Sequence, residues 1–222
     1  MLELLNKLKE PLVETLLLTF IPLVISVILG FLFGTLVFIT SDAGILDTSS
    51  NKGLSILNKI SNAIINILRS VPYLIILIWL LPITKLLVGS IIGWKAAIPS
   101  LVVSATPFFA RMTVIAFSEV PKGTIEASKS LGASTNEIIF KVLLPESLPA
   151  LLSSVAVTAI NLISYSAMAG AIGAGGLGYE AYLYGLIRNN PALMYMATFL
   201  IIVLVFLIQY IGDVIVKKVD KR

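Results

Sequence analysis

The sequence predicts an all-α integral membrane protein. Hydrophobic residues make up 58% of the 222-residue chain and charged residues only 13%, and the mean hydropathy is +1.01. A soluble domain of this length has too little interior to bury so much apolar surface. The apolar residues also come in long runs, and a helix needs about 20 of them to cross a bilayer. We therefore expect residues 1–222 to form a single membrane domain with five transmembrane helices and one polar helical pair.

Five segments are long and apolar enough to span a membrane. They cover, approximately, residues 15–39, 64–83, 96–117, 148–172 and 192–215. The first run is too long for a signal-peptide core and lacks a small-residue cleavage site, so it is expected to be a retained span. It contains Gly30 and Gly34, whose G-x-x-x-G spacing favours close helix packing. The second is irregular, because an amphipathic pattern over 54–68 leads into it and Pro72 and Pro82 would bend or end it.

A polar segment, about residues 121–145, separates the third span from the fourth. Pro121 suits the first turn of a helix, and Gly132 supplies the left-handed conformation that commonly ends one. One face of this helix carries a carboxylate beside small or apolar side chains, namely Glu126, Ala127, Ser128 and Leu131. Small side chains permit close approach by a partner, so this face is a candidate docking surface. The alternative is an ordinary solvated loop.

A second short helix is expected directly after this turn. Ser134 and Glu137 have the spacing of a capping box, which marks a helix start. Pro145 would limit that helix at Leu144. A rigid, capped pair of helices can move as one body, whereas an irregular loop would not transmit a motion.

The distribution of Lys and Arg predicts the orientation of the chain. With the C-terminus inside, the cytoplasmic side holds Lys52, Lys59, Arg111, Lys122, Lys129, Lys141, Lys217, Lys218, Lys221 and Arg222. The outer side then holds Lys7, Lys9, Lys85, Lys95 and Arg188. This excess places the N-terminus outside and the polar helical pair in the cytoplasm. Arg69 lies in or near the second span, where it either snorkels to the cytoplasmic interface or binds a substrate carboxylate.

The fourth span carries a polar face. Its members recur at intervals of three and four residues: Ser154, Thr158, Asn161, Tyr165 and Met168. Such a face could line a path for a small amphipathic amino acid. It could equally supply hydrogen bonds between helices, worth about 0.6 kcal/mol each in membranes. Both readings stay open from the residues alone.

Several classes of function find no support in the sequence. The chain has no Cys and no His, and no acid pair lies within the spans, so neither a metal site nor a membrane-embedded enzyme is expected. The net charge of +4 bears on topology, and no nucleic acid is expected as a partner. Gly173–Gly178 fits G-x-G-x-x-G but follows a membrane helix, so it predicts a tight turn or close approach by a second subunit or binding protein, not a nucleotide site. A channel or an ion-coupled carrier would leave residues 121–145 unexplained.

The polar segment resembles the EAA loop of binding-protein-dependent ABC importer permeases. That pattern is EAA, three residues, G, nine residues, I, one residue, LP. Here it spans Glu126 to Pro145, with Ser128 in place of the second alanine and Val142 in place of isoleucine. Other stretches resemble the methionine-importer permeases of that family, namely 69–73 (RSVPY), 105–112 (ATPFFARM), 165–170 (YSAMAG) and 173–178 (GAGGLG).

The resemblance implies a homodimer of five-span subunits in the bacterial inner membrane. It implies an ABC ATPase dimer on the cytoplasmic side and a substrate-binding protein or lipoprotein outside. ATP would be used by the partner, and this chain would bind no cofactor. The residues that couple it to the ATPase would be Glu126, Ala127, Ser128, Gly132, Leu144 and Pro145. The implied substrate is methionine of either enantiomer or a related amino acid. Two alternative functions are an ABC permease for another small polar solute and an ion-coupled amino-acid carrier.

Overall fold

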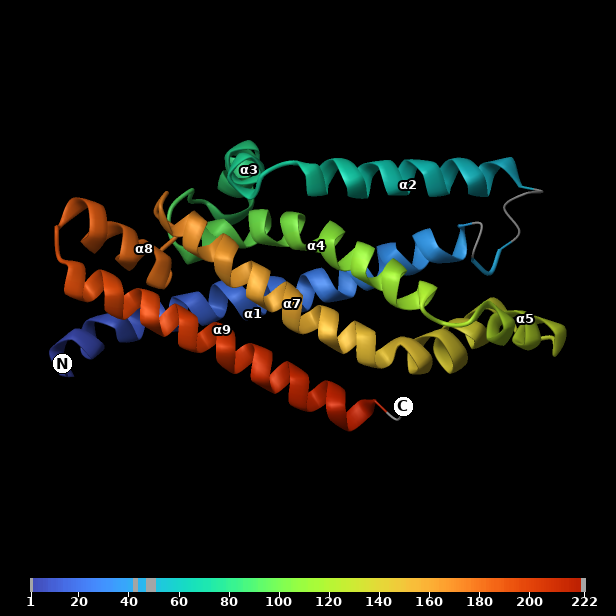
Figure 1. The fold of residues 1–222 in the computed structure, drawn as a ribbon. Coiled ribbons are helices and arrows are strands. Elements are labelled where there is room, and N and C mark those ends of the chain that lie inside the picture. Colours follow the sequence, from blue (N-terminus) through green and yellow to red (C-terminus); the bar gives the residue numbers. More distant parts are fainter. Residues whose placement is uncertain (1, 42–43, 47–50, 221–222) are drawn as a thin grey trace. The chain divides into compact units, whose positions relative to one another are not determined.

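The computed structural model describes residues 2–41, 44–46 and 51–220, and all its regular elements are helical (Figure 1). The α-helices are α1 (Leu2–Ile39), α2 (Lys52–Ser70), α3 (Tyr73–Val88), α4 (Trp94–Ser118), α5 (Lys122–Ser130), α6 (Thr135–Glu137), α7 (Leu144–Gly170), α8 (Gly176–Tyr182) and α9 (Pro191–Val219). Two π-helical turns, η1 (Ile138–Leu143) and η2 (Leu183–Ile187), follow α6 and α8. Lys221 and Arg222, which entered the orientation prediction, lie outside the described residues.

The membrane class predicted from composition is confirmed by the lengths of the helices. Within the described residues, four helices are long and apolar enough to cross a bilayer: Asn6–Ile39, Trp94–Ser118, Thr135–Gly170 and Pro191–Val219. The pair α2 and α3 passes the same test jointly and counts as a fifth span if it is taken as one.

The second expected span, 64–83, is not one straight helix. The chain bends by 106° between α2 and α3. Pro72 occupies the N-cap position of α3, and the residue before a proline is sterically disfavoured from helical geometry, so α2 ends at Ser70. Pro82, in contrast, lies inside α3 and does not end it.

The chain divides into two compact units. The first comprises residues up to Ser26, Val71–Ala105 and Ala156–Ile211; the second comprises Val27–Ser70, Thr106–Val155 and the residues from Gly212 onward. In the first unit, a buried cluster joins α1, α8 and α9 through Leu8, Leu177, Leu193 and Ala197.

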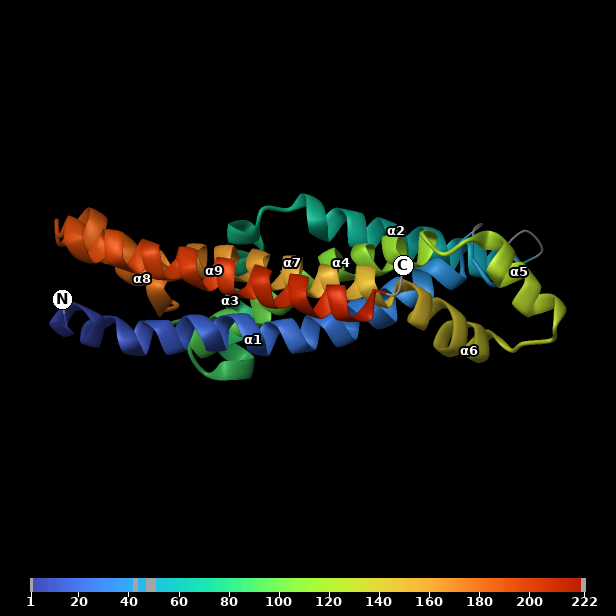
Figure 2. The ribbon, with the colours of Figure 1, turned by 60° about the horizontal axis from the view of Figure 1, so that its bottom comes forward.

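The core of the second unit joins α1 and α4 to the polar segment. Phe38 of α1 and Phe117 of α4 meet edge to face, with ring centroids 5.4 Å apart. The close packing predicted for Gly34 is present, because a Cβ there would lie 2.5 Å from the carbonyl oxygen of Ala110 on α4. A Cβ at Gly30 would lie 2.8 Å from the Thr106 carbonyl oxygen, also on α4. Figure 2 shows α5 and α6 together at the end of this unit where α4 ends.

Candidate functional site

Helix α5 is anchored by one residue and exposes the rest of its predicted docking face. Ile125 is buried in the core of the second unit, while Glu126 and Ala127 are exposed and Ser128 is half-buried. The Ser128 hydroxyl donates to the Thr124 carbonyl oxygen of the preceding turn, at 2.8 Å. The carboxylate of Glu126 is therefore available to a partner outside the described chain.

The end of α5 has the geometry that Gly132 predicts. Gly132 has φ of +81°, which only glycine adopts at little cost. The amide of Ala133 donates to the Ser128 carbonyl (3.1 Å) and the amide of Gly132 to the Lys129 carbonyl (2.9 Å). These two bonds form a Schellman motif, which satisfies carbonyls that the helix end would leave unpaired. Leu131, at this turn, is 88% exposed.

The predicted capping box is also confirmed. The Glu137 amide donates to Ser134 Oγ at 3.4 Å, and the Ser134 amide donates to Glu137 Oε2 at 3.1 Å. Lys141 Nζ donates to the other carboxylate oxygen at 2.9 Å, forming an i,i+4 ion pair. The start of α6 is thus determined by side chains only a few residues apart.

The prediction that this second helix ends at Leu144 is wrong. Residues Thr135–Gly170 form one continuous helix that passes through Pro145. In the π-helical turn η1 the Leu144 amide donates to the carbonyl of Ile139, five residues back. This wider turn accommodates Pro145, which has no amide hydrogen and whose ring would crowd a carbonyl in a regular α-helix. Leu144 and Pro145 therefore lie inside the helix that also carries the predicted polar face.

The polar segment also exposes an aromatic residue that sequence analysis did not single out. Phe140 is 60% exposed and lies in η1, before the start of α7. The sequence gave little indication of this exposure, because Phe140 follows two other apolar residues, Ile138 and Ile139, and these two are buried. Leu131 and Phe140 are apolar groups of the kind that a protein partner covers.

The five residues of the predicted polar face of α7 differ in burial. Thr158 is fully buried, Ser154, Asn161 and Tyr165 are half-buried, and Met168 is 44% exposed. Ser154 donates to the Ala150 carbonyl of its own helix at 2.8 Å. The residues do follow the helix as predicted, but they do not form one open surface.

The exposed line of α7 includes two serines that sequence analysis missed. It runs through Ser153, Val157, Ser164 and Met168. Their spacings of four, seven and four residues are whole turns of a helix, so the pattern was present in the sequence. Serine is common as packing glue in membrane helices, and spacing alone does not separate an exposed serine from a packed one.

Tyr165 stacks on a tyrosine from another helix of the first unit. Its ring lies parallel to that of Tyr73, with 4.9 Å between centroids and 11° between planes. The Tyr73 hydroxyl is 3.2 Å from Ser100 Oγ, and Ser100 in turn donates to the Ala97 carbonyl at 2.9 Å. Sequence analysis assigned Tyr73 no role and included it only in the 69–73 stretch (RSVPY).

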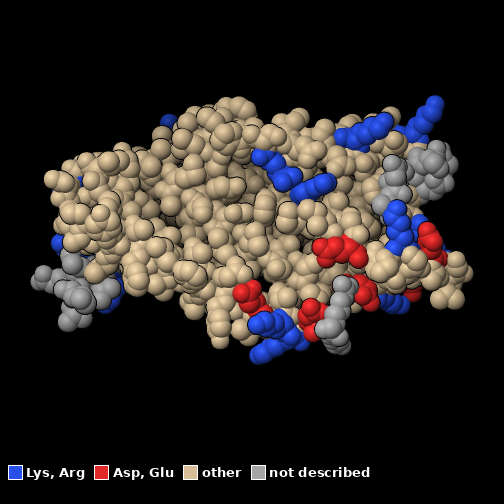
Figure 3. Space-filling view, viewed as in Figure 1, with Lys and Arg blue, Asp and Glu red and all other residues tan. Residues whose placement is uncertain are grey.

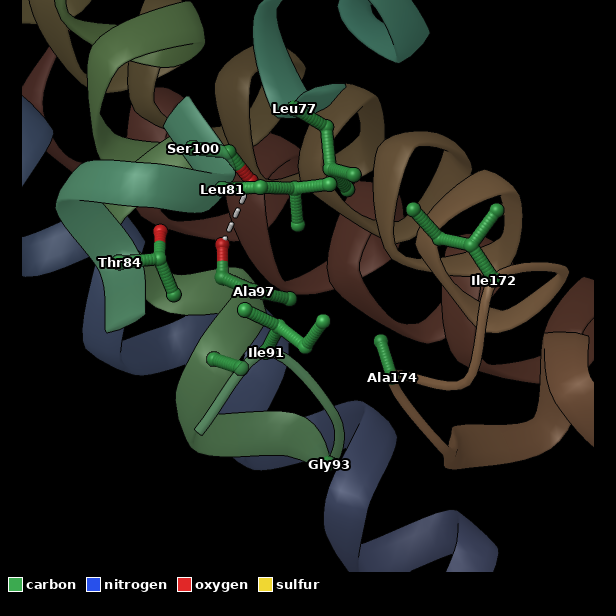
Figure 4. Close-up of a pocket in the computed structure, with 10 residues that line it drawn as sticks. Leu77, Leu81, Thr84, Ile91, Gly93, Ala97, Ser100, Ile172 and Ala174 are labelled. Atoms are coloured by element: carbon green, nitrogen blue, oxygen red, sulfur yellow. Dashed lines mark hydrogen bonds between the residues drawn. The ribbon is translucent and has the colours of Figure 1, made fainter. Parts of the chain in front are cut away.

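A small cavity lies beside Ser100 in the first unit. Figure 4 shows apolar side chains pointing into it, with Thr84 and Ser100 as its polar groups; the wall includes Leu77, Leu81, Ile91, Ala97 and Ile172. Its volume of about 10 Å³ is little more than room for a single water. It is too small for an amino acid.

The glycine run 173–178 brings α8 against helices of the same chain. Gly175 and Gly176 both have φ of +80°, and their turn presents the start of α8 to α1. The Gly176 amide donates to Glu14 Oε2 at 2.7 Å, and the Leu177 amide donates to Thr15 Oγ1 at 2.8 Å. The expected tight turn is present, and its close neighbours in the described chain include α1 and, where Gly178 approaches Ala167, α7.

The same packing changes the acidity of a carboxyl group on α8. Burial raises the pKa of Glu180, and the nearby carboxylate of Glu14 raises it further, while Arg188 opposes both. The Arg188 guanidinium lies 5.3 Å from the centre of the Tyr184 ring. Among the described residues, no group of three or more His, Cys, Asp or Glu side chains could hold a metal ion.

A family model described as "Binding-protein-dependent transport system inner membrane component" matches residues 44–221. The chain belongs to this family. As its inner-membrane component the permease is distinct from the ATPase subunit of such a transporter.

The permease has close relatives over most of its length. It is 51% identical over 187 residues to the methionine import system permease protein MetP of Bacillus subtilis, covering 84% of this chain and 82% of that protein. It is 45% identical over 209 residues to the probable D-methionine transport system permease protein MetI of Pasteurella multocida, covering 94% of each.

Solved structures agree with the fold of the permease. It matches the native crystal form of the inward-facing MetNI methionine ABC transporter with a TM-score of 0.91, 42% identity and 96% of both chains covered. An amino acid ABC transporter crystallised with histidines matches with a TM-score of 0.78 at 19% identity, which supports the fold alone.

Proposed function

We propose that this permease forms the membrane path of an ATP-driven methionine importer that accepts both L- and D-methionine. The observation that carries the proposal is the near full-length identity to permeases named for methionine and D-methionine transport. In this importer a second copy of the chain completes the membrane part, and an ABC ATPase dimer and an extracytoplasmic binding protein complete the transporter. The N-terminus lies outside and the C-terminus in the cytoplasm.

The hairpin of α5 and α6 is the coupling element in this proposal. Glu126, Ala127 and Ser128 contact the ATPase, and the left-handed turn at Gly132 positions Leu131 beside them. Support comes from the exposure of Glu126, Ala127 and Leu131 and from the capped, rigid geometry of both helices. Since Leu144 and Pro145 lie within the helix Thr135–Gly170, the hairpin continues into α7 without an intervening loop, and α7 carries its movement into the membrane.

The path itself uses part of the polar face of α7. Asn161, Tyr165 and Met168 retain exposed surface and line the route. Ser154 and Thr158 serve packing, because the Ser154 hydroxyl bonds to its own helix and Thr158 is fully buried. A thioether makes favourable contacts with aromatic rings, and Tyr165, held against Tyr73, offers such a ring to the methionine side chain.

Reconstitution tests the function directly. The permease would be placed in liposomes with its ATPase and binding protein, and ATP-dependent uptake of labelled L- and D-methionine would be compared with that of other amino acids. Uptake selective for methionine supports the proposal. ATP-dependent uptake of another solute would support an ATP-driven permease but exclude methionine as its substrate. Uptake without ATP would indicate a carrier.

A charge reversal tests the coupling role. Glu126→Lys is expected to leave the assembled complex intact but to abolish coupling, so that ATP hydrolysis no longer drives uptake. Glu119→Lys is the matched control, because Glu119 is an exposed carboxylate at the end of α4, outside the docking face. Normal coupled transport by the Glu126→Lys complex would refute the role assigned to this residue.

A further inference from the structure

Helix α2 presents three different faces. Ile65, Asn66 and Ile67 are consecutive, so they lie about 100° apart around the helix axis. Ile65 is buried, Asn66 is exposed and polar, and Ile67 is an apolar side chain that is 63% exposed. The helix therefore has a packed face, an exposed polar face and an exposed apolar face.

The two exposed faces run along most of α2. The apolar face carries the large exposed side chains of the helix, namely Ile56, Leu57, Ile60, Ile64 and Ile67. The other side of the helix carries polar side chains that are exposed or half-buried, namely Lys59, Asn62, Asn66, Arg69 and Ser70. We call this second set the polar face of α2. Each set recurs every three or four residues, so each forms a continuous line along the helix.

The packed face places α2 at the depth of the bilayer. Ile65 belongs to a buried cluster with Val37 of α1 and Ala110 of α4, in the second unit. Trp94 begins α4 beside Lys95, and Trp beside a cation is typical of a membrane interface. Ala110 lies about 24 Å further along α4, at 1.5 Å per residue. The hydrocarbon core is about 30 Å thick, so Ala110 and Ile65 lie inside it.

Helix α2 runs lengthwise through this depth and does not lie flat on the membrane surface. The Asn58 amide group donates to the Val37 carbonyl oxygen at 2.7 Å and to Thr40 Oγ1 at 3.0 Å, near the end of α1. Figures 1 and 2 show α2 alongside α4, with its start toward the α5 end. Figure 3 shows the acidic side chains on the part of the face toward that end, as expected at an aqueous boundary. The residues after Ile65 thus lie deeper in the hydrocarbon core.

The polar face is not covered within the described chain. The side-chain amide of Asn66 and the guanidinium of Arg69 have no hydrogen bond or ion pair among the described residues. Charged side chains within membrane spans face the bundle interior or a water-filled cavity, because contact with lipid is costly. The isoleucines of the apolar face, in contrast, are suited to lipid. The two exposed faces of α2 therefore require different surroundings at the same depth.

We propose that the polar face of α2 lines a water-filled cavity that opens on the side of the membrane nearer α5, and that this cavity is part of the solute path. Water solvates Asn66 and Arg69, while the apolar face contacts lipid. The polar face adds a wall to the path assigned to α7. Its role in the path rests on the proposed function, whereas the cavity itself does not depend on which solute is transported.

Thiol labelling tests the cavity. The chain contains no Cys, so a single substitution introduces a unique thiol. Asn66→Cys and Ile67→Cys would be compared in the permease–ATPase complex in lipid nanodiscs, with a charged, membrane-impermeant methanethiosulfonate and the intact mass of the permease chain as readout. The two positions differ by about 1.5 Å in depth but lie on different faces. The thiolate is the reactive form and apolar surroundings suppress it, so Ile67→Cys is expected to react at least about tenfold more slowly than Asn66→Cys.

Uptake before and after labelling tests the role in the path. Labelled Asn66→Cys is expected to lose ATP-dependent uptake of the solute that reconstitution identifies, because the added group narrows the cavity. Labelled Ile67→Cys is expected to keep its uptake, because its label lies in lipid. Rapid labelling of Asn66→Cys with unchanged uptake would overturn the role in the path.

Two patterns of labelling would overturn the cavity. If Asn66→Cys reacts as slowly as Ile67→Cys, the polar face is covered by protein, such as a second copy of the chain. If Ile67→Cys reacts as fast as Asn66→Cys, then α2 lies in water and not in the bilayer. If Asn66→Cys does not assemble, Ser70→Cys decides by the same comparison, since it is a nearly isosteric substitution one turn later on the polar face.

Discussion

Substitution of Gly178 by alanine tests the docking of α8 on α7. A Cβ at Gly178 would clash with the Cα of Ala167. It would also lie 2.7 Å from the Ala167 Cβ and 2.8 Å from the Ala167 carbonyl oxygen, whereas an ordinary contact is 3.4 Å or longer. These neighbours are mostly backbone, so no side-chain rotation relieves the clash. Overpacking of this kind costs about 3 kcal/mol at its upper end, and the better helix propensity of alanine returns about 1 kcal/mol. We expect a net destabilisation of about 2 kcal/mol, or about 4–8 °C in apparent Tm.

Thermal unfolding of the assembled complex measures this effect. Gly123→Ala is the matched control, because Gly123 lies within α5 and a Cβ there would meet nothing within 4 Å. That variant is expected to melt at the wild-type temperature or slightly above it. If Gly178→Ala melts no lower than Gly123→Ala, then α8 does not pack on α7 as described.

Three further substitutions test the path, a titrating group and the coupling hairpin. Tyr165→Ala is expected to lower uptake per assembled complex more than it lowers assembly; loss of assembly alone would assign Tyr165 to packing. Glu180→Gln is expected to raise the apparent Tm at neutral pH, because the raised pKa of Glu180 means that its ionised form destabilises the folded state. This difference in Tm between the variant and the wild type should vanish as pH falls below the usual carboxyl range, because Glu180 is then protonated in both the folded and the unfolded protein. A Tm difference that does not change with pH would contradict the prediction. Leu131→Ser should weaken ATPase binding about 10- to 100-fold, because about 1.5–3 kcal/mol of leucine burial is lost. Leu87→Ser is the control, since Leu87 is also a largely exposed leucine but lies on α3, and it should leave binding unchanged. Equal binding by both variants would exclude Leu131 from the interface.

The features that follow from neighbouring residues could be predicted from the sequence. The left-handed turn at Gly132 and the capping box of Ser134 and Glu137 depend on side chains at most a few positions apart, and both are present. Membrane class and most span positions follow from run length and hydropathy, since a bilayer demands a fixed length of apolar helix. The close approach at Gly30 and Gly34 was likewise indicated by their spacing, although not the helix that they meet.

Other features were decided by contacts between distant residues. Pro145 predicts a helix end by local rules, yet the π-helical turn before it allows the helix to continue as α7. The amides of Gly176 and Leu177 donate hydrogen bonds to Glu14 and Thr15, each 162 residues away in the sequence. Tyr165 stacks on Tyr73 of another helix. Periodicity in a sequence states which residues share a face of a helix. Which neighbour that face meets, and whether its polar groups end buried or open, depends on how the helices pack, and packing is a property of the whole fold.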